Sequence, residues 1–136
     1  MIKVMYADNQ DYEYLKNHDP HIRADTLQDK IAAREVIVLK EDGRQIGWLR
    51  YCLFSDVIPF MSMLYVEESY RSKGLGKKLV LFWESEMKRM GYTLVMTSSQ
   101  SDEQAQHFYR KLGYKDSGAL LLPGDPLEIV FLKHLD

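Results

Sequence analysis

The sequence predicts a mixed α and β fold, in the α+β class, within a single domain of residues 1–136. Two observations carry this prediction. Runs of strand-forming residues follow one another with short turns between them, and near Gly74 the hydrophobic pattern changes to the period of a helix. A chain of 136 residues is long enough for one domain and short for two. Apolar residues make up 46% of it, which is enough for a core and argues against disorder.

Strand signals recur along the whole chain. The β-branched run Val36–Leu39 leads to Asp42-Gly43, a pair typical of hairpin turns, and two further runs follow closely. Consecutive strands with short turns indicate an antiparallel meander. The predicted strands are Ile2–Tyr6, Val36–Leu39, Gln45–Leu53, Pro59–Val66, Leu94–Thr97, Tyr114–Leu121 and Glu128–Lys133.

Helical periodicity appears in three segments. The strongest lies between Gly74 and Met90, where Leu75, Leu79, Phe82, Trp83, Met87 and Met90 form one face. We expect the charged residues between them, Glu84 included, on the solvated side. A second helix is predicted over Glu103–Leu112, with Ser101 and Asp102 as caps. In the polar segment from Asp8 to Lys30, Asp25-Thr26 is expected to cap a helix through Ala33.

Composition excludes several classes of protein. The net charge of −2 disfavours a protein that coats nucleic acid or an anionic membrane. One cysteine, Cys52, cannot form an internal disulfide or a Cys-rich zinc site, and we expect it to be a small buried residue. The start lacks a signal peptide and no apolar run could cross a bilayer. We therefore expect a cytoplasmic domain with no metal, no nucleic-acid partner and no membrane partner.

Residues 64–79 contain the most informative segment. A predicted strand ends, a polar turn follows, and Gly74 and Gly76 open the long helix. The first amides of a helix have no internal acceptor and lie at the positive end of its dipole, so glycines there let the backbone approach an anion. Arg71, Lys73, Lys77 and Lys78 add positive charge. The segment is therefore predicted to hold a pyrophosphate.

Two common phosphate motifs do not match this segment. The P-loop pattern fails because Lys78 follows Gly76-Lys77 where Ser or Thr is needed, and because its first glycine is missing. The dinucleotide pattern fails because Leu79 stands where the third glycine should be. The simplest alternative is a plain turn into a surface helix with solvated lysines.

Two motifs resemble those of the GCN5-related N-acetyltransferases, the GNAT superfamily. Arg71-Ser72-Lys73-Gly74-Leu75-Gly76 matches the pattern R/Q-x-x-G-x-G/A, and Ala105 to Tyr114 matches A-x-x-F-Y-x-K-L-G-F/Y. The resemblance spans about Tyr6 to Lys133. It implies a central, mostly antiparallel sheet of about six to seven strands, with two splayed parallel strands and about four helices on both faces. It also implies acetyl-CoA as the co-substrate and an amine as the acceptor.

The resemblance also implies which residues hold acetyl-CoA. In the family, the coenzyme lies where two central strands splay apart, which here would be Pro59–Val66 and Leu94–Ser98. Backbone groups of the first strand would bind the pantetheine arm, and the turn that follows would bind the pyrophosphate. The residues implied as coenzyme-binding are Leu64, Tyr65, Val66, Arg71, Ser72, Lys73, Gly74, Leu75, Gly76, Lys77, Ser101, Ala105, Phe108 and Tyr109.

Tyr109 matches the family position that protonates the departing thiolate, although an aromatic residue on a helix can also be simple packing. The general base stays unassigned. Many relatives carry an acidic residue where this chain has Ser62-Met63, and an Asn where Ser101 and its neighbours lie. Asp56, Glu103 and His107 are candidate bases through water. Glu67 and Glu68 are expected to be surface charges.

Three functions follow as hypotheses. The first is acetyl transfer from acetyl-CoA to a small amine or to a protein or peptide amino group, by direct attack in a ternary complex. The second is a non-catalytic acyl-CoA sensor or partner module, favoured by the missing acidic residue. The third is binding of another diphosphate nucleotide. Relatives are often dimers, so a homodimer stays open, and His18-Asp19-Pro20-His21 is expected to be a surface loop and not a metal site.

Overall fold

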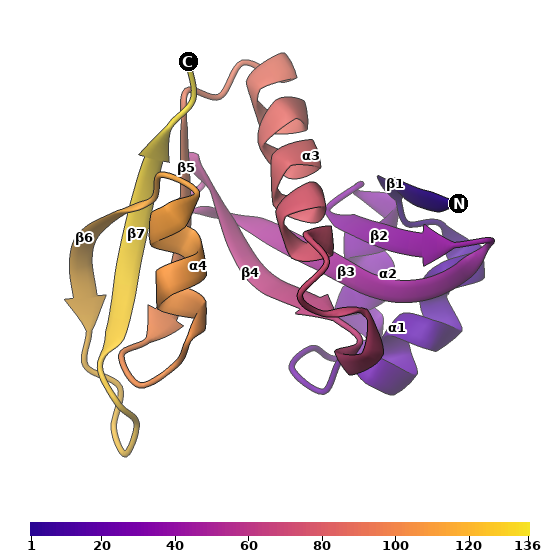
Figure 1. The fold of residues 1–136 in the computed structure, drawn as a ribbon, viewed down its shortest axis with the longest axis horizontal. Helices are drawn as coiled ribbons and strands as arrows, with labels where there is room; N and C mark the ends of the chain where they lie inside the picture. The colour runs from indigo at the N-terminus through magenta and orange to yellow at the C-terminus, as the bar shows by residue number, and fades with distance from the viewer. The chain divides into compact units, whose positions relative to one another are not determined.

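Seven strands and four α-helices follow one another in the computed structural model, which describes residues 1–136 (Figure 1). The strands are β1 Ile2–Tyr6, β2 Val36–Glu41, β3 Arg44–Phe54, β4 Ile58–Val66, β5 Leu94–Gln100, β6 Lys115–Leu120 and β7 Glu128–His134. The helices are α1 Tyr12–His18, α2 Ala24–Ala32, α3 Leu75–Arg89 and α4 Ala105–Lys111, with short 3-10 turns at Asn9–Asp11 and Glu68–Tyr70. All seven predicted strands are present.

The strands form one sheet in the order β1-β2-β3-β4-β5-β7-β6. Strand β4 pairs with β5 in parallel, with Phe60 opposite Met96 and Met61 opposite Thr97. The pairs β1–β2, β2–β3, β5–β7 and β6–β7 are antiparallel. The predicted fold class is therefore confirmed. The sheet is mostly antiparallel with one parallel pair, and the helices lie in the connections between strands along the chain.

Contacts within the chain gather into two compact units. The first unit comprises Met1–Tyr51 and Met63–Trp83, and the second comprises Cys52–Ser62 and Glu84–Asp136. Strands β3 and β4 and helix α3 each contribute residues to both. The assignment of the whole chain to a single domain stays a prediction.

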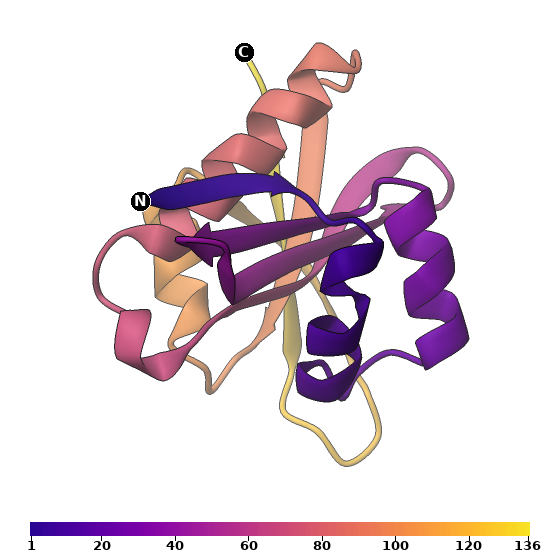
Figure 2. The same ribbon diagram turned by 90° about the vertical axis from the view of Figure 1, so that its right-hand side faces the viewer.

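In the first unit, helices cover both faces of the sheet. Helices α1 and α2 lie beside each other (Figure 2) and bury Leu15, Leu27 and Ile31. These side chains pack in one cluster with Val38 and Trp48, which are opposite each other on β2 and β3. Residues of α3 pack on the opposite face of the same strands, against side chains that alternate with Val38 and Trp48. The ring centre of Trp83 lies 6.0 Å from that of Tyr51, and the ring centre of Phe82 lies 5.9 Å from that of Tyr6.

In the second unit, α4 packs on β5 and β7. The ring of Tyr109 lies 6.0 Å from that of Phe131, which is opposite Thr97 in the β5–β7 ladder. Glu84, at the end of α3 that belongs to this unit, is only 7% exposed. Its carboxylate accepts hydrogen bonds from the Tyr114 hydroxyl at 2.7 Å and from Lys133 Nζ at 2.8 Å. The expected solvated position of Glu84 is therefore wrong, because Tyr114, just before β6, and Lys133 of β7 supply its partners.

Several expected helix ends also differ. Helix α2 begins at Ala24, so Asp25 lies in the first turn, where its carboxylate accepts from its neighbour's amide instead of capping. Helix α4 begins only at Ala105, with no side-chain cap, so Ser101 and Asp102 are not its caps. Met90, expected in the core, is 49% exposed because α3 ends before it.

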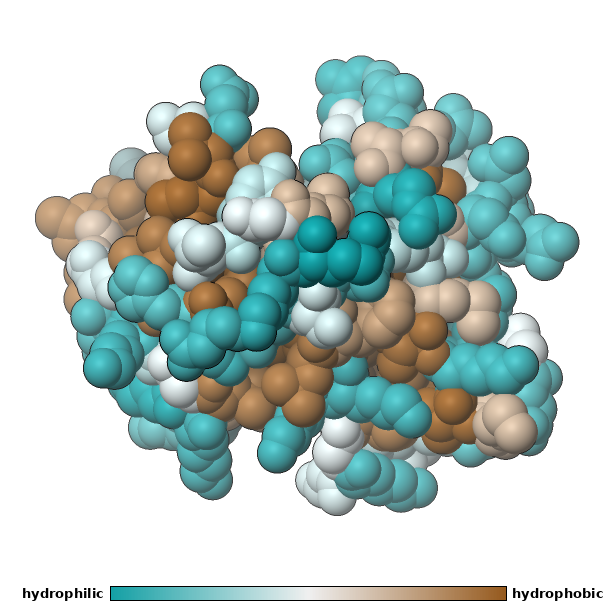
Figure 3. Space-filling view, turned by 90° about the horizontal axis from the view of Figure 1, so that it is seen from above, coloured by the Kyte–Doolittle hydropathy of each residue, from teal (hydrophilic) through white to brown (hydrophobic).

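None of the helices is long and apolar enough to cross a membrane. On the face seen in Figure 3, hydrophilic and hydrophobic side chains are interspersed. The large apolar residues that are exposed include a run at the end of β6 and the start of the β6–β7 connection, Leu120–Leu122.

Candidate active site

The end of β4 approaches β3 unusually closely. A Cβ atom added to Gly47 of β3 would lie 2.6 Å from the backbone oxygen of Tyr65. Beyond it, the amide of Glu67 donates to the carbonyl of Ile46 at 2.8 Å. Only glycine permits this approach. The half-buried segment Leu64–Val66, predicted to bind the pantetheine arm, is therefore held in place from the β3 side.

The turn after β4 leads into the N-terminus of α3. Gly74 has a φ of +77°, and its carbonyl accepts the first helical hydrogen bond from Lys78 at 3.1 Å. By helix geometry, the amides of residues 75–77 then have no acceptor within the helix. Nothing lies within 4 Å of a Cβ added to Gly74, so its surroundings are open. Ser72 also has a positive φ, of 64°. The turn thus presents free backbone donors at the positive end of a fifteen-residue helix.

Basic side chains surround these amides. Arg71 donates through Nε to the carbonyl of Val66 at 2.8 Å, and its guanidinium lies 5.2 Å from the centre of the Tyr65 ring. This contact ties the arginine to the end of β4. Lys73 lies 5.6 Å from the Tyr70 ring, and Lys77 is exposed. The ten predicted residues from Leu64 to Lys77 therefore lie together in the first unit, and an anion such as a diphosphate fits the amides and charges there.

Tyr109 and the remaining predicted residues lie in the second unit. The side chain of Tyr109 is almost fully buried between Phe108, Tyr114 and Phe131, whose ring centres lie 5.5 to 6.0 Å from its own. Burial, together with the charges of Glu103 and Glu128, raises the pKa of Tyr109 to about 12, although a hydrogen bond with Thr97 opposes the shift. The phenol is therefore protonated at neutral pH and is able to donate a proton.

The predicted residues that precede Tyr109 lie around the start of α4. Ser101 is exposed, donates its amide to the carbonyl of Leu127 at 2.7 Å, and accepts from the Gln106 side chain at 2.8 Å. Ala105 is exposed and Phe108 is half-buried. Ser101 lies in the connection between β5 and α4, and Ala105 and Phe108 lie in the first turns of α4.

The carboxylates considered as bases differ in their surroundings. Glu103 accepts from the amide of Gln100 at 2.9 Å, which is a local turn contact, and Asp56 lies in the exposed β3–β4 turn. Glu67 is not a surface charge as expected. It is half-buried, accepts from the Tyr14 hydroxyl at 2.9 Å, and lies 3.5 Å from Arg44. Glu68 is exposed, as expected, and so is His107.

The segment from His18 to His21 is only partly a surface loop. Asp19 is 3% exposed and forms a buried ion pair with Arg50 at 3.0 Å, which anchors the connection between α1 and α2 on β3. His18 stacks on Tyr14 at 4.1 Å. No group of three or more His, Cys, Asp or Glu side chains in the molecule could hold a metal ion. Cys52 is half-buried and accepts a weak hydrogen bond from Ser62 at 3.5 Å.

Glu128 was not singled out in the sequence. It opens β7, and its Oε2 accepts a hydrogen bond from the Ser98 hydroxyl of β5 at 2.7 Å. A charged residue at the start of the apolar run Ile129–Leu132 is the only sequence signal that pointed to it.

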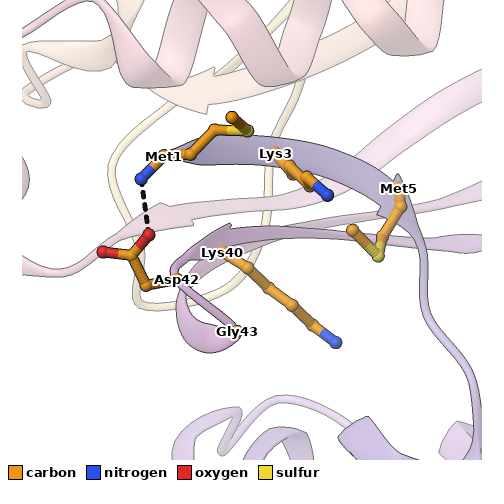
Figure 4. Close-up of a pocket in the computed structure, with 6 residues that line it drawn as sticks. All are labelled: Met1, Lys3, Met5, Lys40, Asp42 and Gly43. Carbon is orange, nitrogen blue, oxygen red and sulfur yellow. Dashed lines mark hydrogen bonds and ion pairs between the residues drawn. The ribbon is translucent and has the colours of Figure 1, made fainter.

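A surface pocket of about 410 Å³ lies elsewhere in the first unit (Figure 4). Met1, Lys3 and Met5 of the β1 segment line it with Lys40, Asp42 and Gly43 of β2 and its turn. The terminal ammonium of Met1 donates to Asp42 at 2.6 Å, and Lys40 pairs with the buried Asp11. No predicted site residue lines this pocket.

Known proteins resemble this chain in fold. It is 24% identical to an acetyltransferase of the GNAT family from Bacillus cereus, with a TM-score of 0.78 over 98% of this chain and 97% of that one. It is 16% identical to the PaiA N-acetyltransferase from Thermoplasma acidophilum in complex with coenzyme A (TM-score 0.80, 99% of each chain). The ribosomal-protein-S18-alanine N-acetyltransferase from Escherichia coli is 15% identical (TM-score 0.80, 98% of this chain and 94% of that one).

The family model described as acetyltransferase (GNAT) domain matches residues 32–116. This range runs from the end of α2 through the α3 turn and Tyr109 to the start of β6, and it covers more than half of the chain. The chain therefore belongs to the GNAT acetyltransferase family.

Proposed function

We propose that this protein transfers the acetyl group of acetyl-CoA to the amino group of an acceptor, by direct attack in a ternary complex. The observation that carries the proposal is the turn at residues 71–77. It combines free helix amides, two residues with positive φ and several cations in a member of an acetyltransferase family. The solved structure of PaiA contains coenzyme A, which supports the same ligand for this chain.

The backbone from Arg71 to Lys77 would hold the pyrophosphate. Amides at a helix start bind anions because they lack internal acceptors and share the positive end of the dipole. Arg71 would add a full charge while remaining fixed by its hydrogen bond to Val66. Backbone groups of Leu64–Val66 would bind the pantetheine arm. Ser101, Ala105 and Phe108 stay predicted coenzyme contacts.

Tyr109 would donate a proton to the departing sulfur. Coenzyme A supplies the acetyl group as a thioester, whose leaving sulfur needs a proton near neutral pH. A phenol with a pKa raised to about 12 holds its proton until it is needed. Protonation of a leaving group typically contributes a factor of about 10²–10⁴ to a rate.

The acceptor would be an amine on a small molecule or on a protein. The alanine N-acetyltransferase of Escherichia coli acts on a ribosomal protein, so a protein amino group has a precedent in the fold, and a small-molecule amine is the alternative acceptor. A second candidate is an acyl-CoA sensor without catalysis. It is favoured by Ser62, an exposed serine on β4 where many relatives carry an acidic residue.

Binding of the coenzyme is tested by calorimetry with acetyl-CoA, CoA and ATP. We expect the wild type to prefer acetyl-CoA and CoA over ATP, and Arg71→Ala combined with Gly74→Val to weaken CoA binding at least tenfold. Lys88→Ala is the matched control, because Lys88 is an exposed cation at the far end of α3. Equal affinity in the double variant and the control, or a preference for ATP, would contradict the proposed site.

Catalysis is tested by thiol release with four acceptor classes. These are a peptide with a free N-terminus, a lysine peptide with a blocked N-terminus, a polyamine and an aminoglycoside. Turnover of any class supports an acetyltransferase. Tight CoA binding with no turnover across the panel would favour the sensor.

A further inference from the structure

The pocket in Figure 4 lies at the edge of the sheet and shares no residue with the turn at residues 71–77. Strand β1 pairs only with β2, so its other edge is free. The residues that line the pocket come from the β1 segment and from β2 and its turn: Met1, Lys3, Met5, Lys40, Asp42 and Gly43. Its volume of about 410 Å³ is within the range of small-molecule sites, which is roughly 300–1,000 Å³.

Two lysines of this pocket lie directly opposite each other. Lys3 of β1 is the register partner of Lys40 of β2, so both side chains project from the same face of the sheet. Figure 4 shows them extending in the same direction. Like charges at directly opposite positions destabilise an antiparallel pair of strands. The two ammonium groups are therefore unfavourable neighbours unless negative charge compensates both of them.

The protein compensates only one of these two lysines. Lys40 forms an ion pair with the buried carboxylate of Asp11 at 3.0 Å. Lys3 is exposed and has no hydrogen-bond or ion-pair partner in the structure. Asp42, the one carboxylate of the lining, is paired with the ammonium group of Met1 at 2.6 Å. The pocket therefore carries one positive charge in excess, and that charge is on Lys3.

The rest of the lining is largely apolar. Met5 is half-buried and packs against the core cluster beneath α1 and α2, and Met1 adds a second thioether. Methionine side chains adapt to ligands of different shape, and the stems of the two lysines add further methylene groups. None of the lining residues is aromatic, so a nucleobase would have no ring to stack on. The lining fits an aliphatic body that carries a single anionic group.

We propose that this pocket is a binding site for a small organic monoanion, with the anionic group at Lys3 and Lys40 and the aliphatic body against the methionines. An alkyl carboxylate is the simplest ligand of this class. Its one negative charge matches the excess charge of the lining, and its methylene groups match the thioethers and lysine stems. The inference goes beyond acetyl transfer, because the pocket shares no residue with the proposed coenzyme site.

The test titrates hexanoate into the full chain and follows the backbone amide shifts by NMR. We expect saturable shifts at residues 3–5 and 40–43 at hexanoate concentrations up to about 10 mM, which covers weak small-molecule binding. Absence of saturable shifts in these two segments over that range would overturn the proposal. Saturable shifts confined to residues 71–77 would overturn it too, because they would place the anion at the proposed coenzyme turn.

Lys3→Glu separates binding from folding. The variant loses the unpaired cation and places opposite charges across β1 and β2, so its melting temperature should be retained or raised. Its affinity for hexanoate should fall at least tenfold, and Lys3→Met, which keeps the side-chain length, should lose affinity as well. Lys88→Glu, at an exposed lysine of α3, is the matched control and should change the affinity less than twofold. Equal affinities in all four proteins would overturn the proposal.

A second arm varies the ligand. Inorganic phosphate carries negative charge without an aliphatic body, and hexylamine carries the body with the opposite charge. Each should bind at least tenfold more weakly than hexanoate, and equal binding of either one would overturn the assignment. Calorimetry should find the affinity of Lys3→Glu for acetyl-CoA within about twofold of wild type, whereas a parallel loss of both ligands would contradict a separate site. Failure of the wild type to bind acetyl-CoA would refute the proposed function and leave the hexanoate result standing.

Discussion

At the scale of single residues, burial determines what the tyrosines can do. Tyr109 and Tyr114 are buried and Tyr14 is half-buried, and burial raises the pKa of each. Tyr114 and Tyr14 donate to Glu84 and Glu67, so their protons are engaged in structural hydrogen bonds. Tyr109 contacts Thr97 and three aromatic rings, and it is the tyrosine that we propose as the proton donor.

Tyr109→Phe separates chemistry from packing. The ring and its contacts remain, so we expect the melting temperature and the affinity for acetyl-CoA to change little. Loss of the hydroxyl should lower kcat by about 10²-fold or more. Steady-state thiol release measures this, and an unchanged kcat would show that Tyr109 is a packing residue only.

The raised pKa of Tyr109 also predicts how stability depends on pH. The folded chain holds this proton more tightly than the unfolded chain, whose tyrosines titrate near 10. The resulting stabilisation is complete below pH 10 and is lost as the pH rises through about 12. The free energy of unfolding, measured with urea, should therefore fall between pH 8 and pH 11. The fall should be smaller in Tyr109→Phe than in the wild type, by about 1 kcal/mol. Equal losses in both proteins would contradict the shift.

At the scale of elements, the junction from β4 to α3 positions the proposed coenzyme site. The strand presents the backbone of Leu64–Val66, Arg71 ties the following turn back to Val66, and the helix begins after Gly74. On the other side, β3 contributes Gly47, whose missing side chain lets the two backbones approach. The geometry of the site thus depends on a residue that precedes it by almost twenty positions.

Gly47→Ala should damage both stability and coenzyme binding. The added methyl group would meet the Tyr65 carbonyl at 2.6 Å and the Val66 Cα at 3.3 Å, and backbone atoms can yield only by shifting β4. We expect a loss of about 2–3 kcal/mol in the free energy of unfolding. Ser62→Ala, at an exposed position of the same strand, is the control for denaturant unfolding. Tolerance of Gly47→Ala would show that β4 is more adaptable than its packing indicates.

At the scale of the whole molecule, the coenzyme should act as a stabilising ligand. A ligand that binds only the folded chain adds about 2.7 kcal/mol at a concentration 100 times its Kd. For 136 residues this corresponds to a rise in melting temperature of roughly 5–10 °C. Thermal unfolding with acetyl-CoA measures it, and the Arg71→Ala, Gly74→Val variant should show a much smaller rise at the same concentration. Equal rises would place the ligand elsewhere.

The sequence by itself determined the order of the elements and the motif-bearing segments. Strand periodicity, the Asp42-Gly43 turn and the helical spacing after Gly74 are local signals. Each depends only on residues close together in the sequence, so it can be recognised without the rest of the fold. All seven strands and the helix at the proposed phosphate turn were found in this way. The family also followed from the two motifs around Gly74 and Tyr109.

Only the tertiary structure decided which charged side chains are buried and which residues they pair with. Glu84 meets Lys133 across 49 positions, Arg50 meets Asp19 across 31, and Glu128 meets Ser98 across 30. Helical periodicity assigned Glu84 to solvent because it describes one helix and not the strands packed against it. Glu128 carried no motif, so its contact with Ser98 emerged only when β5 and β7 paired. Pairing partners that are distant in sequence leave no local pattern, because the contact that makes them matter forms only when the strands come together.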